Sequence, residues 1–178
     1  GIVLVLYISY ILNIVDVLTS LLYKVSIKKY QVEIIKKMVK KVKVALVYDF
    51  DGTLSTTNMQ DYGLIQLFNM RTKTFWKQAN QWWHDNDADQ ITSSMYYFVK
   101  MSQQKKVPLT KKVFYKCGQD IEYYAGVEEW FDRINHYGNM LDLDIEHYII
   151  SSGYEEIIEG SAIRKYFKEV FGCAYAYD

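Results

Sequence analysis

The sequence predicts an α/β fold, namely a doubly wound, Rossmann-like parallel sheet with an all-helical insertion. Two short apolar runs, 42–48 and 146–150, have the composition of strands in a parallel sheet, and the first is of the kind that is buried on both faces of such a sheet. Apolar residues recur at helical spacing in the long stretch between these runs and again just ahead of the second run. Strands that alternate with helices in this way are typical of a sheet wound by crossover connections.

Length and composition are those of a folded protein. The chain has 178 residues, of which 50% are hydrophobic and 24% are charged, and it contains a single proline. These values suit one domain with a small insertion and exclude a disordered or low-complexity segment. Two cysteines, Cys117 and Cys173, are too few for a disulfide framework, so we expect a reducing compartment.

Positive charge is concentrated near the amino end. Eight lysines and one glutamate lie between Lys24 and Lys43, although basic and acidic residues balance at 21 each over the whole chain. The part beyond position 43 therefore carries 13 basic residues against 19 acidic ones. A domain with this excess of acids is not expected to bind nucleic acid.

Residues 1–37 differ in composition from the rest and allow three interpretations. Asp16 is the only charged residue in 1–23, which is rich in Ile, Leu and Val, so this stretch would be long enough to cross a bilayer and leave the lysines in the cytosol. Its polar residues form one stripe at helical spacing, which equally suits an interfacial or packed helix. Alternatively, Met38 begins the working domain and residues 1–37 are foreign to it.

An acid pair follows the first predicted strand. Asp49 and Asp51 are one residue apart on an extended backbone, so their side chains point to the same side while Phe50 points into the core. Gly52 then permits a sharp turn. The carboxyl end of a parallel strand is where open α/β folds bind ligands. Two carboxylates this close repel each other unless a cation neutralises them or one keeps its proton.

Both of these solutions favour phosphoryl transfer over an ordinary acidic turn. Mg²⁺ prefers hard oxygen ligands such as the carboxylate of Asp49. The Asp49 carboxylate can attack phosphorus to form an aspartyl-phosphate, while Asp51 protonates the leaving alcohol and then deprotonates the hydrolytic water. Asp49 and Asp51 are therefore the predicted catalytic and metal-binding pair.

The string D-F-D-G-T-L at 49–54, placed after a hydrophobic strand, resembles the first motif of the haloacid dehalogenase-like (HAD) superfamily of hydrolases. The resemblance implies that Asp49 is the nucleophile and Asp51 the general acid/base. It also implies that Mg²⁺ is held by the Asp49 carboxylate and the Asp51 backbone carbonyl. The dehalogenases of this family lack the second acid, so the resemblance favours a phosphatase or a phosphomutase. It covers residues 44–178 and is strongest for the phosphoserine-phosphatase-like branch.

The second predicted strand runs into Ser151, Ser152 and Gly153. A hydroxyl and free backbone N–H groups at a strand-to-helix turn suit a phosphoryl oxygen, although Ser and Gly are also ordinary loop residues. The resemblance assigns the phosphate contact to Ser151, with the amide of Ser152 beside it. With Gly153 and with Thr53 of the first motif, these residues form the predicted phosphate-binding set.

Residues 56–125 form the predicted insertion between the two parts of the α/β core, 38–55 and 126–178. Thr110 is the expected N-cap of one of its helices. The resemblance implies that the insertion is a C1-type cap, a lid that closes over the substrate and excludes water. Residues 58–61 either contact substrate or begin a helix. Three tryptophans at helical spacing either line the lid or belong to the core, namely Trp76, Trp82 and Trp83.

Only 27 residues follow Ser151, and they contain a predicted helix over 154–160 and a predicted strand over 169–174. Active members of the family also have a third-motif Lys or Arg and a fourth-motif pair of acids. Lys165 and Lys168 fall earlier than that lysine usually does, and the terminal Asp178 cannot supply an acid pair. The chain is therefore interpreted as the front part of such an enzyme.

These patterns together predict a Mg²⁺-dependent phosphatase that hydrolyses a small phosphorylated metabolite, acting in the cytoplasm or from a membrane anchor. Without the last motifs we expect weak activity or none, because stabilising charge is lost. The alternative from another class is a non-catalytic, membrane-tethered remnant of the fold that serves as a binding module. The alternating acids at 85–89 do not predict a calcium site, because the Gly and Glu of such a loop are missing.

Overall fold

The computed structural model describes residues 17–34 and 41–177, and the chain divides into two units after Lys41. In the first unit, residues 17–34 are helical and their side chains are exposed. Most of the hydrophobic stretch 1–23 and the predicted boundary at residue 37 lie outside the described residues. Within the two described ranges, no helix combines the length and the apolar character that crossing a membrane requires.

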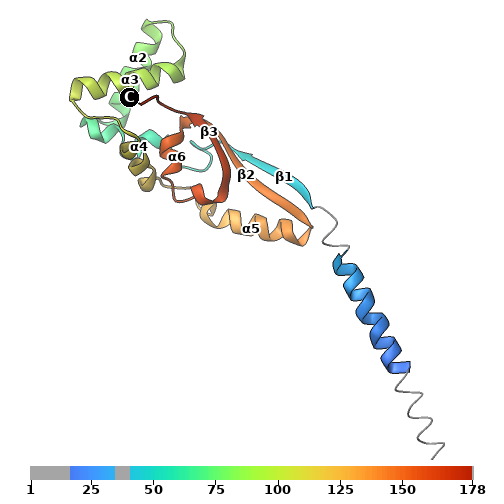
Figure 1. Ribbon diagram of the computed structural model, residues 1–178. Helices are drawn as coiled ribbons and strands as arrows, with labels where there is room; N and C mark the ends of the chain where they lie inside the picture. Colours follow the sequence, from blue (N-terminus) through green and yellow to red (C-terminus); the bar gives the residue numbers. More distant parts are fainter. Residues whose placement is uncertain (1–16, 35–40, 178) are drawn as a thin grey trace, which may run out of the picture. The chain divides into compact units, whose positions relative to one another are not determined.

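A parallel sheet forms the centre of the second unit (Figure 1). Its strands are β1 (Val42–Tyr48), β2 (Leu143–Tyr154) and β3 (Phe167–Cys173), in the order β1-β2-β3. Both neighbouring pairs are parallel, with Tyr48 opposite Ile149 and Ile149 opposite Val170. The predicted α/β class with a parallel sheet is thus confirmed.

Two strand boundaries differ from the sequence prediction. β2 is longer than the predicted run 146–150, because it begins three residues earlier and includes the serines that were expected to form a turn. Its register with β3 is irregular between Ile150 and Tyr154, so this end of β2 is extended but not evenly paired. β3 begins at Phe167, two residues before the predicted start. β2 begins earlier because Leu143, Asp144 and Ile145 pair with the first residues of β1, and β3 begins earlier because Phe167 pairs with His147.

Helices cover one face of the sheet among the described residues. Phe131 of α5 (Val127–Met140) contacts the rings of Tyr48, His147 and Phe167, one from each strand, at 5.9, 5.2 and 5.1 Å between ring centroids. The connections from β1 to β2 and from β2 to β3 step in the same direction along the sheet. Right-handed crossovers then place α5 and α6 (Glu155–Glu159) on the same face.

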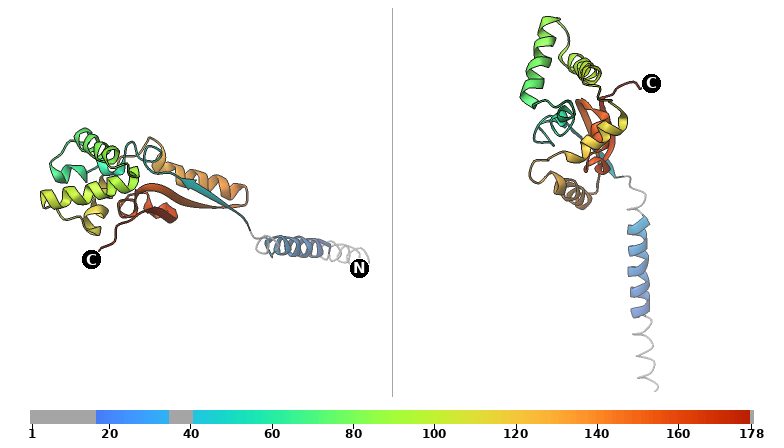
Figure 2. Two further views of the ribbon diagram at one scale, coloured as in Figure 1. Left: turned by 90° about the horizontal axis from the view of Figure 1, so that it is seen from above. Right: turned by 90° about the vertical axis from the view of Figure 1, so that its left-hand side faces the viewer.

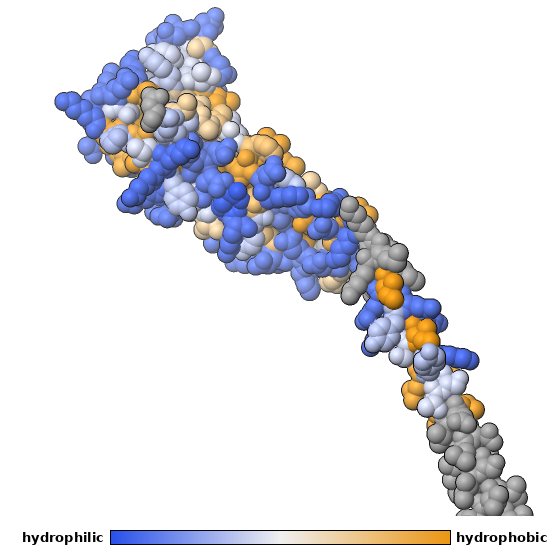
Figure 3. Space-filling model, in the orientation of Figure 1, coloured by the Kyte–Doolittle hydropathy of each residue, from blue (hydrophilic) through white to orange (hydrophobic). Residues whose placement is uncertain are grey.

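The opposite face of the sheet is exposed in the described part of the chain. Val47, Ile150 and Phe171 are 55%, 58% and 50% exposed, and orange hydrophobic residues surface in the sheet region of Figure 3. The prediction that the run 42–48 is buried on both faces is therefore wrong for the described chain. Its apolar residues alternate in burial because β1 is an edge strand with helices on one side only.

The stretch between β1 and α5 is helical. Its elements are η1 (Met59–Asp61), η2 (Ile65–Phe68), α2 (Thr72–Asp85), α3 (Gln90–Lys105), α4 (Lys111–Cys117) and η3 (Gly118–Asp120). In the two views of Figure 2, α2 and α3 lie side by side. Thr110 caps α4 by accepting a hydrogen bond from the Val113 N–H, which confirms that prediction. In the acidic segment 85–89, for which no calcium site was predicted, Asp89 caps α3 by accepting a hydrogen bond from the Thr92 N–H.

An aromatic core joins this helical stretch to the sheet. Phe75 of α2 and Phe98 of α3 are fully buried with their ring centroids 4.4 Å apart, and Phe98 contacts Tyr154 at the end of β2. Burial of each such ring contributes roughly 1.5–3 kcal/mol. The carboxyl ends of all three strands point toward the helical stretch (Figure 1). Loops at these strand ends therefore face the helices α2 and α3.

Candidate functional site

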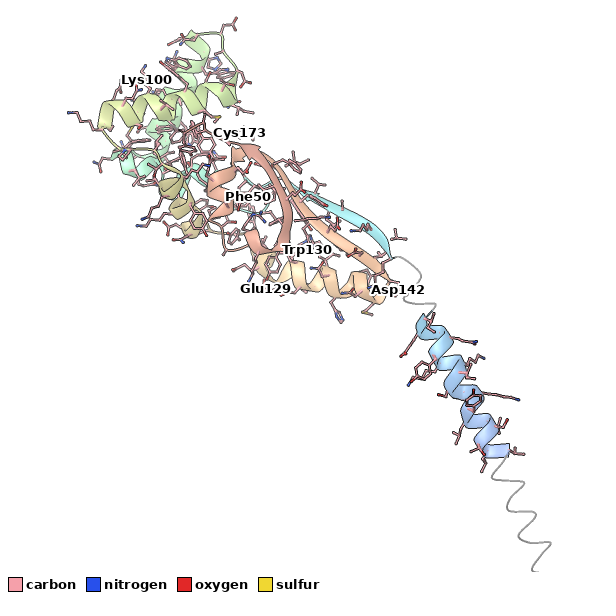
Figure 4. All side chains as sticks on the ribbon, in the orientation of Figure 1. Phe50, Lys100, Glu129, Trp130, Asp142 and Cys173 are labelled. Atoms are coloured by element: carbon pink, nitrogen blue, oxygen red, sulfur yellow. The ribbon has the colours of Figure 1, made fainter. Side chains whose placement is uncertain are left out.

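The predicted acid pair lies at the carboxyl end of β1. Asp49 is exposed, Asp51 is partly buried, and Phe50 between them is 0% exposed, so its predicted inward orientation is confirmed. Gly52 has a φ of +70°, the left-handed conformation that the sequence predicts for a sharp turn. The turn closes on the Phe50 carbonyl, which accepts hydrogen bonds from the N–H groups of Leu54 and Ser55 at 2.9 and 3.1 Å. Figure 4 labels Phe50 at this end of the sheet.

The environment of Asp51 raises the pKa of its carboxyl from 3.8 to about 6. Desolvation by burial is the largest cause, and the negative charges of Asp49 and Asp61 raise the pKa further. The Met59 N–H acts in the opposite direction, because it donates a 2.8 Å hydrogen bond to Asp51 Oδ1. A carboxyl with a pKa near 6 exchanges a proton readily near neutral pH, as a general acid/base requires.

Met59 connects the loop after β1 to the end of β2. Its side chain is 0% exposed, and its Sδ atom accepts a hydrogen bond from the Tyr154 N–H at 3.0 Å. A Cβ added at Gly153 would lie 2.0 Å from Met59 Cε, so a larger residue there would require the Met59 side chain to move. The same residue therefore holds Asp51 through its backbone and packs beneath Gly153 through its side chain.

The predicted phosphate-binding residues are placed differently from one another. Ser151 is partly buried, and its Oγ accepts a hydrogen bond from the Gly153 N–H at 3.1 Å. Ser152 is exposed and lines the same pocket as Asp51. Thr53 is exposed, and its N–H donates to the Phe50 carbonyl at 3.3 Å. The structure thus brings Ser152 together with Asp51, and Met59 links Gly153 to Asp51.

A pocket of about 510 Å³ opens between these loops and the helices α2 and α3. Asp51 and Ser152 line it on the side of the sheet. On the helical side it is lined by Trp76 and Trp83 of α2, whereas Trp82 stacks on Tyr96 with ring centroids 4.6 Å apart. The sequence left open whether the three tryptophans line the lid or belong to the core. Trp76 and Trp83 line the pocket, whereas Trp82 packs against Tyr96.

The sequence did not predict the contacts through which several residues organise this site. Ser55 is fully buried and its Oγ donates a 2.7 Å hydrogen bond to the Thr57 carbonyl. The Asp61 carboxylate accepts hydrogen bonds from Trp76 Nε1 and Thr57 Oγ1, both at 2.8 Å. Residues 58–61 stood out only by their position after the motif. Nothing in their residue types indicates that Met59 bridges two loops or that Asp61 raises the pKa of Asp51.

The oxygen atoms that could bind a metal at this site suit a hard cation. The side chains available are the carboxylates of Asp49 and Asp51, with no sulfur or imidazole among them, and Mg²⁺ binds through one or two carboxylates while it keeps several waters. Among residues 17–34 and 41–177, no group of three or more His, Cys, Asp or Glu side chains is arranged to hold a metal. Asp49 and Asp51 would therefore be the residues that hold such a cation, which would supply positive charge against a phosphate.

Neither candidate for the catalytic lysine is seen beside the acid pair. Lys168 lies on β3 and donates to Glu146 Oε2 at 2.9 Å, and Lys43 also pairs with Glu146. Glu146 pairs in register with Ala45, four residues before Asp49, so the ion pair lies away from the carboxyl end of the sheet. Lys165 lies in η4 (Arg164–Tyr166) with its Nζ 4.9 Å from the ring centroid of Tyr166.

Comparisons with known proteins identify the fold of the second unit. No family model matches the sequence. A protein of Borreliella burgdorferi strain B31, described as uncharacterized, is 27% identical over 142 residues, which cover 74% of this chain and 50% of that protein. The chain therefore spans about half the length of the curated relative that it matches.

Solved structures resemble the chain at lower sequence identity. A phosphoserine phosphohydrolase-like protein from Francisella tularensis subsp. tularensis SCHU S4 has a TM-score of 0.50 and 16% identity over 78% of this chain and 60% of that chain. The L-2-haloacid dehalogenase RSc1362 has a TM-score of 0.42 and 12% identity over 74% of this chain and 64% of that chain. At 16% identity the likeness to the first of these shows the fold alone. The chain therefore shares the α/β fold of this phosphoserine phosphohydrolase-like protein.

Proposed function

We propose that this chain belongs to a Mg²⁺-dependent phosphatase that hydrolyses phosphomonoesters through an aspartyl-phosphate intermediate. The observation that carries the proposal is the unequal environment of two neighbouring carboxyl groups at the end of β1. Asp49 is exposed, whereas burial raises the pKa of Asp51 to about 6. Two acids whose environments differ in this way suit the separate roles of nucleophile and general acid/base. The similarity to a phosphoserine phosphohydrolase-like protein supports the same reaction class.

The two acids would act in sequence. An oxygen of the Asp49 carboxylate attacks phosphorus, the bond from phosphorus to the alcohol oxygen breaks, and that oxygen takes its proton from Asp51. The ionised Asp51 then removes a proton from the water that hydrolyses the aspartyl-phosphate. Mg²⁺, held by the Asp49 carboxylate and the Asp51 backbone carbonyl, would supply positive charge against the phosphoryl oxygens and leave the Asp51 carboxyl free to exchange its proton. Ser151, Ser152, Gly153 and Thr53 are the proposed phosphate contacts.

We further propose that the chain by itself has weak activity. No Lys or Arg forms an ion pair with Asp49 or Asp51 in the described residues. A carboxylate nucleophile and a phosphate repel each other, so a missing cation raises the barrier to attack. The same observation suits the alternative function, a membrane-tethered remnant that binds a ligand without catalysis and is anchored through residues 1–23.

The phosphoryl site can be tested by ligand-induced stabilisation. The full chain is heated with Mg²⁺ and beryllofluoride, which mimics a phosphoryl group on an aspartate. We expect a raised melting temperature for the native chain and none for Asp49→Asn, because the mimic attaches to that carboxylate. Asp142→Asn, on an exposed residue at the opposite end of the sheet (Figure 4), is the matched control and should respond like the native chain. An equal rise in melting temperature with Asp49→Asn would contradict the assignment of Asp49 as the nucleophile. No rise in any variant would favour the non-catalytic alternative.

A further inference from the structure

The pocket beside Asp51 presents uncharged amides from three segments. Asn58 and Gln60 come from the loop after β1, Asn80 from α2 and Gln90 from the start of α3. None of these four side-chain amides has a hydrogen-bond partner among the described residues. Each amide offers donors and an acceptor at once. The pocket therefore has a set of unused groups that match hydroxyls, which also donate and accept.

Two indole rings add apolar surface to the same pocket. Trp76 and Trp83 line it from α2, and Trp76 is held in place because its Nε1 donates to Asp61 Oδ1 at 2.8 Å. The Trp76 ring also packs edge-on against Phe75, with centroids 5.4 Å apart. A rigid aromatic wall opposite polar amides is suited to a ligand with both C–H and O–H surface.

The charge around the pocket is negative. None of the described residues that line it is Lys, Arg or His, whereas Asp51 lines it directly. Asp49 and Asp61 are close enough to raise the pKa of Asp51 by their charge. A substrate that carried a carboxylate besides its phosphate would meet acids and no cation there. Burial of such an unpaired charge is costly, so a substrate of this kind is disfavoured.

We propose that this pocket binds the leaving group of a sugar or polyol phosphate, a neutral alcohol with several hydroxyls. This inference rests on the proposed phosphatase function and specifies its substrate class. The volume of about 510 Å³ falls within the range of sites for small ligands and is large enough for a hexose. A site that hydrogen-bonds hydroxyl groups rejects analogues that lack them, because its own polar groups are then left unpaired.

The experiment measures binding to the full chain by its tryptophan fluorescence in the presence of Mg²⁺. The probes are glucose 6-phosphate, phosphoserine, phosphocholine and inorganic phosphate, which share the phosphoryl group and differ in what is attached to it. We expect glucose 6-phosphate to bind at least tenfold more tightly than phosphoserine or phosphocholine. Phosphocholine is included because indole rings also bind quaternary ammonium groups.

A pair of adjacent substitutions locates the binding. Asn80→Leu removes an unpaired amide from the pocket wall. It should weaken the binding of glucose 6-phosphate about five- to tenfold, while inorganic phosphate binds as before. Gln81→Leu is the matched control, because Gln81 bonds to Asp85 on the surface of α2 and does not line the pocket. It should leave both affinities unchanged.

The possible failures are distinguishable. Tighter binding of phosphoserine or phosphocholine, with inorganic phosphate still bound, would overturn the sugar or polyol assignment and leave the phosphatase proposal standing. An equal loss with Gln81→Leu and Asn80→Leu would also overturn it. Absence of binding by every probe, inorganic phosphate included, would overturn the phosphatase proposal and this inference with it.

Discussion

The proposed role of Asp51 requires its carboxyl to ionise, and its buried position opposes ionisation. A carboxyl whose pKa rises from 3.8 to about 6 on folding holds its proton more tightly in the folded chain than in the unfolded one. Well below pH 3.8 both states are protonated and the difference has no effect on stability. As pH rises from 3.8 to 6, the folded state is progressively destabilised relative to the unfolded state. The full loss of stability is present well above pH 6.

Removal of this charge should therefore stabilise the protein while it abolishes the proposed chemistry. We expect Asp51→Asn to raise the free energy of unfolding by about 3 kcal/mol at pH 7.5 and by about 0.5 kcal/mol at pH 4. The amide oxygen can still accept the hydrogen bond from the Met59 N–H. Urea denaturation at the two pH values provides the measurement, with the distant Asp142→Asn as control. A gain that does not depend on pH would mean that desolvated charge is not the cause.

Gly153 matters for space and not for backbone freedom, since its φ is not in the left-handed region. A Cβ at this position would collide with Met59 Cε, so Gly153→Ala should destabilise the chain by about 1–3 kcal/mol. Met59→Ala removes the obstacle but leaves a cavity. In a double-mutant cycle measured by urea denaturation, we expect the two changes together to cost at least about 1 kcal/mol less than their sum. Simple additivity would show that the two residues do not press on each other.

At the scale of elements, the sequence predicts the local pattern well. The acid pair at a strand end, the inward Phe50, the turn at Gly52 and the Thr110 cap all follow from residue spacing, and the structure contains each of them. These features depend on the alternation of side chains along a strand or on hydrogen bonds within a few residues. Local rules are sufficient for them.

Contacts between distant segments were not predictable in the same way. Met59 reaches Tyr154 across 95 positions in the sequence, and Lys168 pairs with Glu146 through the register of β2 and β3. The identities of Met59 and Lys168 do not indicate which distant residue each of them contacts. The buried His147 is similar, because its ring nitrogens lie 3.0 Å from Tyr48 Oη and from Asn135 Oδ1 of α5. These partners become neighbours only once the sheet and α5 are assembled.

At the scale of the whole second unit, the sheet is covered unequally. One face packs against α5, and the other exposes apolar residues of all three strands in the described chain. Exposed apolar surface on a sheet is a common site of contact with other protein surfaces. The sequence prediction of two buried faces assumed helices on both sides. The order β1-β2-β3 places the connecting helices on one side.

Two adjacent isoleucines on β2 test this description because their side chains point to opposite faces. Ile149 is 0% exposed and Ile150 is 58% exposed. We expect Ile149→Ala to lower the free energy of unfolding by about 2–4 kcal/mol, and Ile150→Ala by less than about 1 kcal/mol, because only the first removes buried contacts. The two substitutions are matched in chemistry and in position, so the difference between them reports burial alone. Equal losses in urea denaturation of the full chain would show that both faces of the sheet are covered in solution.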